Sequence, residues 1–566
     1  MHSAPTRPGR FLAPPPIAFA AFLLLALPAL LALLALITAG CSPGGPGPPA
    51  AGGGGAGGGP RRGGTVVTGW TAEPTGVNQL ANPMTQVTTE LQLQLFLRLV
   101  EEQPDFQRHP PSLAPQLAGS YDWSPDHKLL TFHLREAQWS DGVPVTADDV
   151  RWTWQAETSP EIAWDYANML QPVTDVEVVD PHTVRYHFSR AYAKQMLDVN
   201  EGFILPKHAW EKLPFAQWRQ NSQWFRQHLV VDGPFTIAAW QPQQEIVLQR
   251  NPRYYDPARP YLDRVVMRII PDQNSMMTQL LNGELDFAAG ISPGDAPRVQ
   301  ARPELALQAY DFRTWVGVAW NPMRPLFADP EVRRALTLAI DRETIVKTLW
   351  GPYGRVADSP IMSTVWAHDR ALAPWPYRPD EARRILAAKG WRMPAAGGVL
   401  ARDGKPFSFE LITNSGNQQR VDATVMIQEQ LRRLGIEVQP KKVEFNTFSS
   451  GLEKGSYDAA ITGLTMDTGL DLTDPFGSKS GGDTNVVRYN NPEVDRLIAA
   501  AMGHLDIGAA RAELERIQEI LHRDQPYTFL WESQRLAGLS RRVHDAQPNP
   551  LFSLFHLRDW WVEPRS

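Results

Sequence analysis

The sequence predicts an α/β protein, because two kinds of local pattern alternate along most of its 566 residues. Short segments with the two-residue alternation of a strand, such as residues 130–135, are followed by segments that begin with helix-capping residues. Turn sequences such as Asp180-Pro181-His182 separate paired strand segments and predict hairpins. Hydrophobic residues make up 43% and charged residues 20%, which is typical of a soluble globular body with a sizeable core.

In the first half, residues 174–188 and 235–248 each predict a hairpin, and Thr146-Ala147-Asp148-Asp149 predicts a helix start with a capping box. Residues 265–270 form an apolar strand segment, and a helix over about 275–282 follows it. Gly283 ends that helix and residues 285–287 resume a strand. This β-α-β unit favours parallel pairing.

The second half repeats the pattern with clear helix caps. Asp329-Pro330 and Asn491-Pro492 each combine an N-cap residue with proline at the first helical position. Ile427, Leu431 and Leu434 make one apolar stripe of a helix that Gly435 ends, and residues 436–438 begin a strand. Most of these residues are expected to pack in a core.

Composition excludes several classes of function. The formal net charge is -6, which does not favour a nucleic-acid partner. The single cysteine, Cys41, excludes a disulfide framework and a cysteine-based zinc site. Nineteen tryptophans predict a large cleft or packed aromatic layers, and fifty prolines predict many rigid loops.

The first forty residues predict an export signal. They contain no acidic residue, two arginines near the start and a long apolar run over about 17–37. Thr38-Ala39-Gly40-Cys41 resembles a bacterial lipobox, in which the cysteine is lipidated and becomes the new N-terminus, although leucine is usual where Thr38 stands. An uncleaved membrane anchor is the alternative, because the run is long enough to span a bilayer.

Residues 41–64 are predicted to form a lipidated cysteine followed by a flexible tether, since they are nearly all glycine, proline and alanine. A GxGxxG match within this segment has no neighbouring strand or helix and carries no nucleotide prediction. The body is therefore expected outside the cytoplasm, in the periplasm or at the outer face of the cell membrane.

A series of motifs in the body resembles one family, the extracellular solute-binding proteins of family 5, which serve ABC importers for peptides and nickel. The most specific motif is WSDGVPVTADDV at residues 139–150. The others, in the family's order, are PQLA at 115–118, WSPD at 123–126, GPF at 233–235, RNPRYY at 250–255, LNGELD at 281–286, RRALTLAIDR at 333–342, GSYD at 455–458 and NNPEVD at 490–495. Together they cover nearly the whole exported body.

The resemblance implies a two-lobed periplasmic-binding-protein-like fold of type II, of the large cluster with an extra subdomain, and a hinge between the lobes. Lobe I is expected over 65–312, including the subdomain at about 90–230, with a C-terminal return over 528–566. Lobe II is expected over 313–527. Two rigid lobes on a hinge can close over a ligand and bury most of its surface.

The resemblance also implies ligand-binding residues. In peptide-binding members an aspartate after a G-W-x-x-D pattern holds the ligand's amine, and Gly463-Leu464-Thr465-Met466-Asp467 matches it with leucine in place of tryptophan. Asp467 and the adjacent Met466 are therefore expected in the site, and Asp471 or Asp474 could serve instead of Asp467.

A ligand carboxylate needs a cation or a helix N-terminus. Arg420, at the start of the helix that carries Ile427, is the expected cation, and Asn414 stands where dipeptide-binding members have an arginine. Trp315 and Trp320 near the crossing into lobe II, and Thr88 on the N-terminal loop, are expected pocket walls. The competing interpretations are a solvated loop acid for Asp467, an ordinary ion pair for Arg420 and core packing for the tryptophans.

These features predict a monomeric binding lipoprotein that delivers short oligopeptides to an ABC permease and its ATPase, without a cofactor. The body contains no G-x-S-x-G, S-x-x-K, H-E-x-x-H or P-loop motif, so an enzyme is not predicted. His127 and His133 lack a carboxylate at ligand spacing, and no metal site is predicted. The alternatives are a carrier of nickel-chelate or oligosaccharide, a secreted peptide hydrolase and a signalling receptor.

Overall fold

The computed structural model describes residues 59–395, 397–480 and 484–565. The predicted export signal, Cys41 and most of the tether lie outside the described residues. Gly58–Ser566 is one compact unit. Within the described ranges, no helix combines the length and apolarity needed to cross a membrane.

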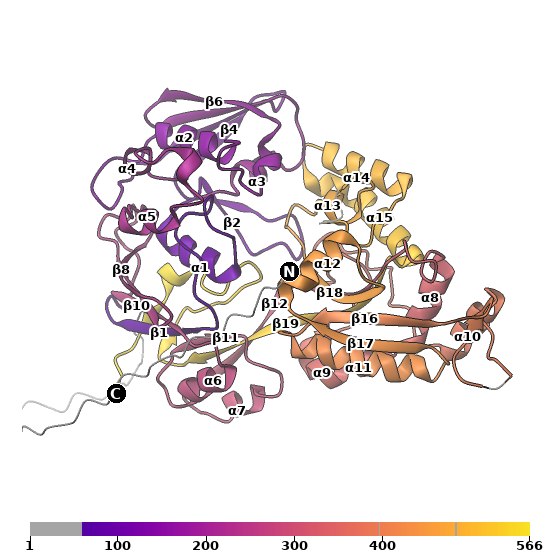
Figure 1. Cartoon of the computed structure of the whole chain (residues 1–566). Helices are drawn as coiled ribbons and strands as arrows, with labels where there is room; N and C mark the ends of the chain where they lie inside the picture. The colour runs from indigo at the N-terminus through magenta and orange to yellow at the C-terminus, as the bar shows by residue number, and fades with distance from the viewer. Residues whose placement is uncertain (1–58, 396, 481–483, 566) are drawn as a thin grey trace, which may run out of the picture. The chain divides into compact units, whose positions relative to one another are not determined.

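The body is built around one large mixed sheet, with strand labels as in Figure 1. In spatial order its strands are β17 (Glu437–Val443), β16 (Ser408–Asn414), β18 (Ala459–Thr465), β12 (Leu305–Trp320), β19 (Tyr527–Ser540), β11 (Phe287–Ala289), β1 (Thr65–Trp70), β10 (Arg264–Ile269), β9 (Glu245–Arg250) and β8 (Phe235–Gln241), with β13 (Gly354–Arg355) paired to β19.

The long antiparallel pair β12 and β19 lies at the middle of this sheet. Their register runs from Leu305 opposite Ser540 to Ala319 opposite Tyr527. The first part of β12 pairs with β19 alone, whereas its part from Thr314 onward also pairs with β18. These two strands therefore join the β16–β18 part of the sheet to the β11–β1–β10 part.

The predicted β-α-β units are parallel. β10, α6 (Gln273–Leu281) and β11 follow one another, and β10 and β11 both run parallel to β1, which lies between them. In the second half, β16, α11 (Gln418–Arg432) and β17 form a parallel unit as well. The predicted hairpins are β6 with β7 and β8 with β9, both antiparallel.

Alternate residues of the central strands face two different cores. Leu411 of β16 packs with Ile427 and Leu431 of α11, whereas the next residue, Ile412, packs with Phe448 of α12 (Phe445–Lys454). Figure 1 accordingly has α9 (Arg342–Trp350) and α11 below this part of the sheet and α12 above it. β16 is therefore buried on both faces over residues 411–413.

A second, smaller sheet lies within the predicted subdomain. Its strands are β4 (Ala118–Trp123), β5 (Leu129–Leu134), β7 (Thr183–Phe188) and β6 (Val173–Asp180). Three further pairs of short strands are β2 (Val100–Glu102) with β3 (Leu113–Pro115), β14 (Ala401–Arg402) with β15 (Lys405–Pro406), and β20 (Val543–His544) with β21 (Trp561–Val562).

The most specific motif, at 139–150, has a structural role. Trp139 is fully buried, Gly142 adopts a φ of 94° in the turn, and Asp141 lies 2.8 Å from His208. The Asp149 carboxylate accepts a 2.9 Å hydrogen bond from the Thr146 backbone N–H, as the predicted capping box requires. The motif thus fixes the start of α2 (Ala147–Glu157) in the core of the subdomain.

Two further helices, α8 and α14, begin where the sequence predicts. Asp329 caps α8 and Asn491 caps α14, each with proline at the first turn. The helices not yet given are α1 (Gln86–Leu95), α3 (Gln195–Val199), α4 (Lys207–Trp210), α5 (Ser222–Gln227), α7 (Ala296–Gln300), α8 (Pro330–Ala339), α10 (Pro379–Ala388), α13 (Thr473–Phe476), α14 (Pro492–Gly503) and α15 (Arg511–Asp524).

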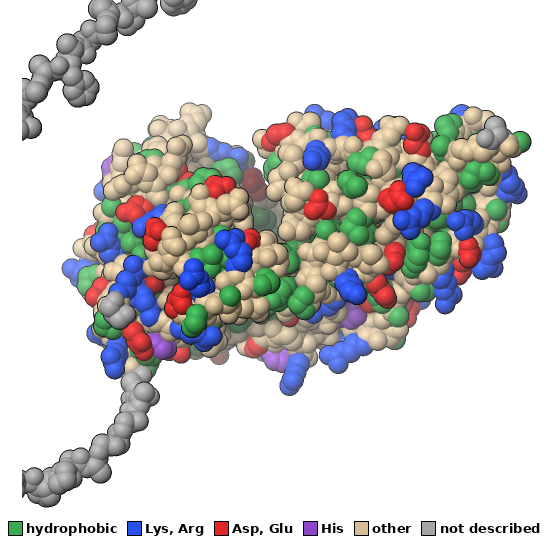
Figure 2. Space-filling view, turned by 90° about the horizontal axis from the view of Figure 1, so that it is seen from below, with side chains coloured by type: hydrophobic (Ala, Val, Ile, Leu, Met, Phe, Trp, Pro, Cys, Tyr) green, Lys and Arg blue, Asp and Glu red, His purple; other side chains and the backbone are tan. Residues whose placement is uncertain are grey.

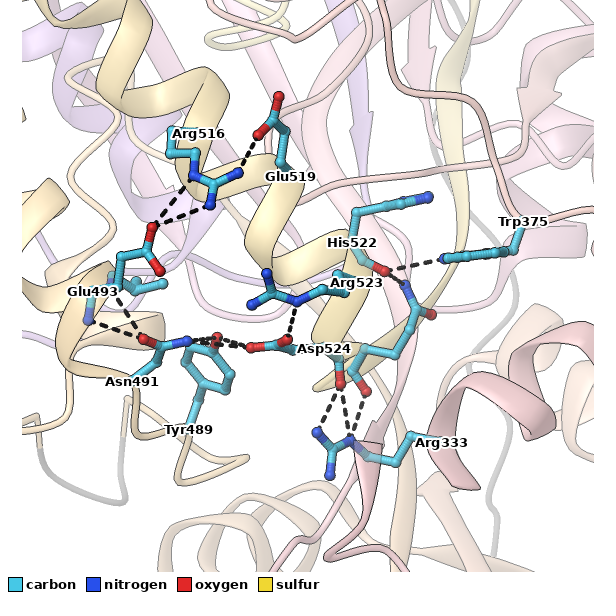
Figure 3. A network of polar contacts seen from close by, with 12 residues as sticks. Arg333, Trp375, Tyr489, Asn491, Glu493, Arg516, Glu519, His522, Arg523 and Asp524 are labelled. Atoms are coloured by element: carbon cyan, nitrogen blue, oxygen red, sulfur yellow. Dashed lines mark hydrogen bonds and ion pairs between the residues drawn. The ribbon is translucent and has the colours of Figure 1, made fainter. Parts of the chain in front are cut away.

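A polar network around Asp524 joins α8, α14 and α15 (Figure 3). The Asp524 carboxylate accepts hydrogen bonds from the Tyr489 hydroxyl at 2.7 Å and from Arg523 at 2.9 Å. The Asp524 backbone carbonyl accepts a further bond, of 2.7 Å, from Arg333 of α8. Arg333 is in the family-like motif at 333–342, so that motif is explained by packing within the predicted lobe II.

The hydrophobic core falls into separate clusters. The largest contains residues from Val66 to Phe287 together with Ala537 to Val562, and two others contain mainly residues between Trp315 and Trp531. The domain limits 65–312, 313–527 and 528–566 stay predictions. Charged side chains of both signs are interspersed over the face in Figure 2, as expected for a body with a small net charge.

Candidate functional site

Several of the predicted site residues lie at the carboxyl ends of the parallel strands β16 and β18. β16 ends at Asn414 and leads into α11, which carries Arg420. β18 ends at Thr465, and Met466 and Asp467 follow it directly. In α/β sheets, ligands bind outside the carboxyl ends of the strands, so this edge is the candidate ligand-binding site.

Arg420 is a partly buried cation, and no acidic partner is found for it among the described residues. Its guanidinium donates to Asn414 Oδ1 at 3.3 Å and packs on Gly463, where a Cβ atom would lie 2.5 Å from Arg420 Nη2. Its Nε has no hydrogen-bond partner in the described part of the chain. Burial lowers the pKa of the guanidinium to about 10. An anion bound here would relieve that desolvation.

Gly463 therefore has a direct steric role beside the predicted cation. Any residue larger than glycine at this position would place its Cβ atom too close to Arg420 Nη2. Asn417 caps α11 by accepting a 3.0 Å hydrogen bond from the Arg420 backbone N–H, which fixes where the side chain leaves the helix. The structure thus brings Arg420, Asn414 and β18 together, as the sequence predicts for a cation near the strand end.

Asp467 is paired with a lysine that the sequence analysis missed. Lys194 Nζ lies 3.2 Å from Asp467 Oδ2, 3.6 Å from Asp198 Oδ1 and 3.7 Å from Asp471 Oδ2. The Lys194 side chain is 10% exposed and the Asp467 side chain 45% exposed. One lysine and three aspartates carry a formal charge of -2, so the cluster retains an excess of negative charge.

Burial and the neighbouring charges shift the pKa values of Lys194 and Asp198 in this cluster. Burial alone would lower the pKa of Lys194, but the carboxylates of Asp467, Asp198 and Asp471 raise it above its ordinary value. Burial raises the pKa of Asp198 to about 6, although Lys194 opposes that change. Gly469 makes room for the lysine, because a Cβ atom there would lie 3.0 Å from Lys194 Cε.

The two alternative acids follow Asp467 closely along the chain. Asp471 donates its backbone N–H to Asp467 Oδ1 at 3.2 Å, and its own carboxylate accepts a 2.9 Å bond from the Thr473 N–H. Asp474 lies in the short helix α13. The structure thus brings Asp467 and Asp471 together around Lys194.

A second set of buried charges lies beside this loop. Arg313 of β12 donates to the Met466 backbone carbonyl at 2.7 Å, and burial lowers the pKa of its guanidinium. Burial raises the pKa of Glu102, a residue that also interacts with Thr468 and Arg313. Met466 itself is 3% exposed and packs in a core cluster, so its backbone rather than its side chain takes part in this arrangement.

Trp315 and Trp320 are core residues. Neither has exposed surface. Trp315 packs against Tyr527 and Phe529, and the Trp320 indole N–H donates to Thr528 Oγ1 at 3.0 Å. In this structure they form the packed aromatic layers that the tryptophan content predicts, and they provide no open wall for a ligand.

Thr88 is fully buried and its hydroxyl is already engaged. It accepts a 2.9 Å hydrogen bond from the Thr75 backbone N–H and contacts the hydroxyls of Thr75 and Thr85 at 3.0 and 2.8 Å. Thr88 lies in the first turn of α1 rather than on a loop. Its predicted place on an N-terminal loop is therefore wrong, and its hydrogen bonds stabilise the start of that helix.

The missed residues share one property: their partners are distant in the sequence. Lys194 and Asp467 are separated by 273 residues. The one local signal was the Lys194–Asp198 spacing of i and i+4, which is common on any helix. Within the described ranges no group of three or more His, Cys, Asp or Glu side chains is placed so that it could hold a metal ion.

Comparisons with known proteins identify the family. The model of the bacterial extracellular solute-binding proteins, family 5 middle region, matches residues 112–485. The oligopeptide-binding protein AppA of Bacillus subtilis is 30% identical over 515 residues, covering 89% of this chain and 92% of AppA. The periplasmic oligopeptide-binding protein OppA of Salmonella typhimurium is 28% identical over 444 residues, covering 72% of this chain and 76% of OppA.

The structural comparison agrees. The structure of B. subtilis AppA in complex with a nonapeptide superposes with a TM-score of 0.76 at 29% identity, covering 89% of this chain and all of that one. The two-lobed periplasmic-binding-protein fold expected from the motifs is thereby confirmed. The chain belongs to the bacterial extracellular solute-binding proteins of family 5.

Proposed function

We propose that this protein is the lipid-anchored binding component of an ABC importer, which captures short peptides and delivers them to a membrane permease and its ATPase. Membership of a solute-binding family supports the capture and release of an unaltered solute. The similarity to AppA, a protein named for oligopeptide binding and solved with a nonapeptide, supports peptides as the ligand class.

The observation that carries the proposal is an unpaired cation and a separate acidic cluster at the carboxyl edge of the sheet. Arg420 is a partly buried cation, and no charged group among the described residues offsets its desolvation. Asp467 belongs to a cluster with a surplus of two negative charges. A peptide with a free amine and a free carboxylate would supply one counterion to each, because buried charges require compensation.

The spacing of the two charges favours short ligands. Arg420 packs on Gly463, which is four residues before Asp467 along β18 and its extension. Four residues of extended chain span about 13 Å, which is close to the length of an extended peptide of about four residues. In the proposed site the peptide amine contacts Asp467 and Asp471, and the carboxylate contacts Arg420 and Asn414.

The membrane anchor in this proposal is a lipid on Cys41. The lipobox-like sequence and the uncharged segment that follows it support this assignment. The anchored body would lie outside the cytoplasm as a monomer. A chain with Cys41→Ser should lose the lipid mass and leave the detergent phase in phase partitioning, while an unchanged partition would contradict the lipid anchor.

Isothermal titration calorimetry tests the ligand class. We expect dissociation constants below millimolar for peptides of three to five residues with free termini. Mass spectrometry of the purified protein should also detect co-purified peptides of intact sequence. Tight binding of a nickel chelate or an oligosaccharide without peptide binding, or turnover of a bound peptide, would overturn the proposal. Genes for a sensor rather than a permease beside this one would argue against import.

A further inference from the structure

An arginine-lined hollow lies where the tether joins the folded body. It has a volume of about 520 Å³, and residues 61–65 and Val67 line it together with residues 562–565 and Arg542. The arginines in its wall are Arg61, Arg62, Arg542 and Arg565. None of these residues belongs to the candidate ligand site at the strand ends.

The floor of the hollow is rigid. Arg542 makes two hydrogen bonds of 2.7 Å to the buried carboxylate of Asp286 and one of 2.8 Å to the Thr65 carbonyl. The Arg565 guanidinium lies 3.4 Å from the same carboxylate and stays half exposed. Gly64 packs against β21 so closely that a Cβ atom would lie 2.5 Å from Val562 Cγ1. Residues 61–64 are thereby held in place beside the C-terminal segment.

The hollow has a surplus of positive charge. Its wall contains four arginines and one carboxylate, that of Glu563. Two further carboxylates adjoin it: Asp286, and Asp263, which accepts from the Gly64 N–H and lies 2.9 Å from Arg250. The Asp286 carboxylate forms ion pairs with Arg542 and Arg565, and the Glu563 carboxylate lies 3.1 Å from His544 Nε2. Arg61 and Arg62 are exposed on the rim, and Arg62 donates only to the Pro257 carbonyl among the contacts described. The hollow therefore offers guanidinium groups to an external anion.

The sequence places this hollow next to the proposed lipid anchor. Arg61 and Arg62 are the first charged residues after Cys41, and the first acidic residue of the chain is Glu73. Arg61 lies twenty residues after Cys41 along the chain, and a glycine-rich tether of that length, as the sequence predicts, would have a root-mean-square length of about 25 Å. The arginines are thus the part of the body held closest to the membrane surface, where the local concentration of lipid headgroups is high.

We propose that this hollow binds the phosphate groups of an anionic phospholipid membrane and thereby docks the base of the body on the surface that carries its anchor. The inference rests on the proposed anchoring at Cys41. Arginine forms bidentate hydrogen bonds to phosphate, and clusters of basic residues beside an anchor bind anionic membranes cooperatively with it. Docking would keep residues 61–64 at the membrane.

The test uses vesicle co-sedimentation with the chain from Ser42 onward, which contains the whole compact unit. The variant is R61Q/R62Q/R565Q, because Arg542 is tied to Asp286 and its loss would disturb folding. The matched control is R378Q/R432Q/R433Q, which removes the same charge from arginines that are 62–68% exposed elsewhere. Circular dichroism checks that both variants fold.

We expect the wild-type chain to bind phosphatidylcholine vesicles containing 30 mol% phosphatidylglycerol, and not pure phosphatidylcholine, with binding that weakens as salt rises. The hollow variant should lose at least about tenfold in vesicle partitioning, and the control should keep most of its binding. Equal losses in both variants, no preference for anionic vesicles, or submillimolar binding of inorganic phosphate without vesicle binding would overturn the proposal. Peptide affinity, measured in parallel, reports separately on the proposed function.

Discussion

Lys194 Nζ lies 3.2 Å from Asp467 Oδ2 and joins two parts of the chain that are 273 residues apart. Lys194 comes from the predicted subdomain of lobe I, and Asp467 follows β18 in the predicted lobe II. With the predicted domain limits, the ion pair would cross between the lobes at the carboxylate proposed to bind the ligand amine. In that case one acidic cluster would serve both ligand binding and the contact between the lobes.

Lys194→Met should destabilise the protein more at pH 7.5 than at pH 5. Without the lysine, buried Asp198 loses its counterion and must either remain charged or take up a proton. Its pKa is already raised to about 6, so protonation near pH 5 relieves most of the cost. We expect a loss of roughly 2 kcal/mol at pH 7.5 in urea unfolding.

Lys207→Met is the matched control for Lys194, because Lys207 contacts the exposed carboxylate of Asp148. An exposed ion pair contributes about 0–1 kcal/mol, so this variant should change little at either pH. Equal effects of the two substitutions, or a Lys194 effect that does not depend on pH, would contradict the role given to the buried cluster.

Asp467→Asn should weaken binding of a tetrapeptide with a free amine by at least about tenfold, because a charge-assisted hydrogen bond is lost. N-acetylation of the peptide should weaken wild-type binding similarly and have little further effect on the variant. Calorimetry of the four combinations gives the coupling between the carboxylate and the amine. If the two losses simply add, Asp467 does not contact the amine. Asp380→Asn, at a side chain that is 89% exposed, is the control.

Arg420→Gln should weaken binding of peptides with a free carboxylate by about ten- to a hundredfold. The affinity for C-terminally amidated peptides should be nearly unchanged, because these lack the anion that compensates the guanidinium. Arg432→Gln, on the exposed end of the same helix, should leave both affinities unaltered. If the Arg420 variant binds both forms as tightly as the wild type does, Arg420 does not contact the ligand carboxylate.

Local features of the fold were predictable because their causes are local. The hairpin over 174–188 and the caps Asp329 and Asn491 depend on neighbours within a few residues. The insertion of β1 between β10 and β11 depends on pairing between segments about 200 residues apart, and no local pattern reports it. The family-like motifs supplied the two-lobed architecture that periodicity alone does not give.

The candidate site was predictable only in part. Arg420 follows from its position where a strand leads into a helix, and Asp467 follows from its match to the family's G-W-x-x-D pattern. The residues around Trp320 in the sequence do not distinguish a tryptophan that lines a pocket from one that packs in a core. In the structure Trp320 packs in a core. Lys194 was missed because a salt bridge between segments distant in the sequence leaves no periodic signal in either of them.

Asp232→Asn should stabilise the protein at alkaline pH. Asp232 is buried, its Oδ1 accepts a 3.0 Å hydrogen bond from the Leu97 N–H, and its Oδ2 has no partner. Burial raises the pKa of Asp232 to about 8. Because this lies above the unfolded value of about 4, the stabilising contribution is full below about pH 4 and is lost as pH rises to about 8.

Urea unfolding at pH 5 and pH 9 measures this effect. The wild type should lose roughly 2–5 kcal/mol more than the Asp232→Asn variant over that interval. Glu157, whose pKa burial also raises to about 8, provides a second site, and Glu157→Gln should act in the same direction. Parallel pH profiles for the wild type and both variants would show that these carboxyl groups are not protonated in the folded protein near neutral pH.

Gly233→Ala should be strongly destabilising, which would explain the glycine of the GPF motif. A Cβ atom at Gly233 would lie 2.5 Å from the carbonyl carbon of Leu95 and 2.8 Å from the Gln94 oxygen. These are backbone atoms at the end of α1, so they cannot move aside as a flexible side chain would. We expect a loss of roughly 3 kcal/mol.

The control is Gly451→Ala within α12, where a Cβ atom has no neighbour within 4 Å. That substitution should instead stabilise by about 0.5–1 kcal/mol through helix propensity. Urea unfolding of the two variants checks the contrast, and similar stabilities would show that α1 shifts to accommodate the methyl group.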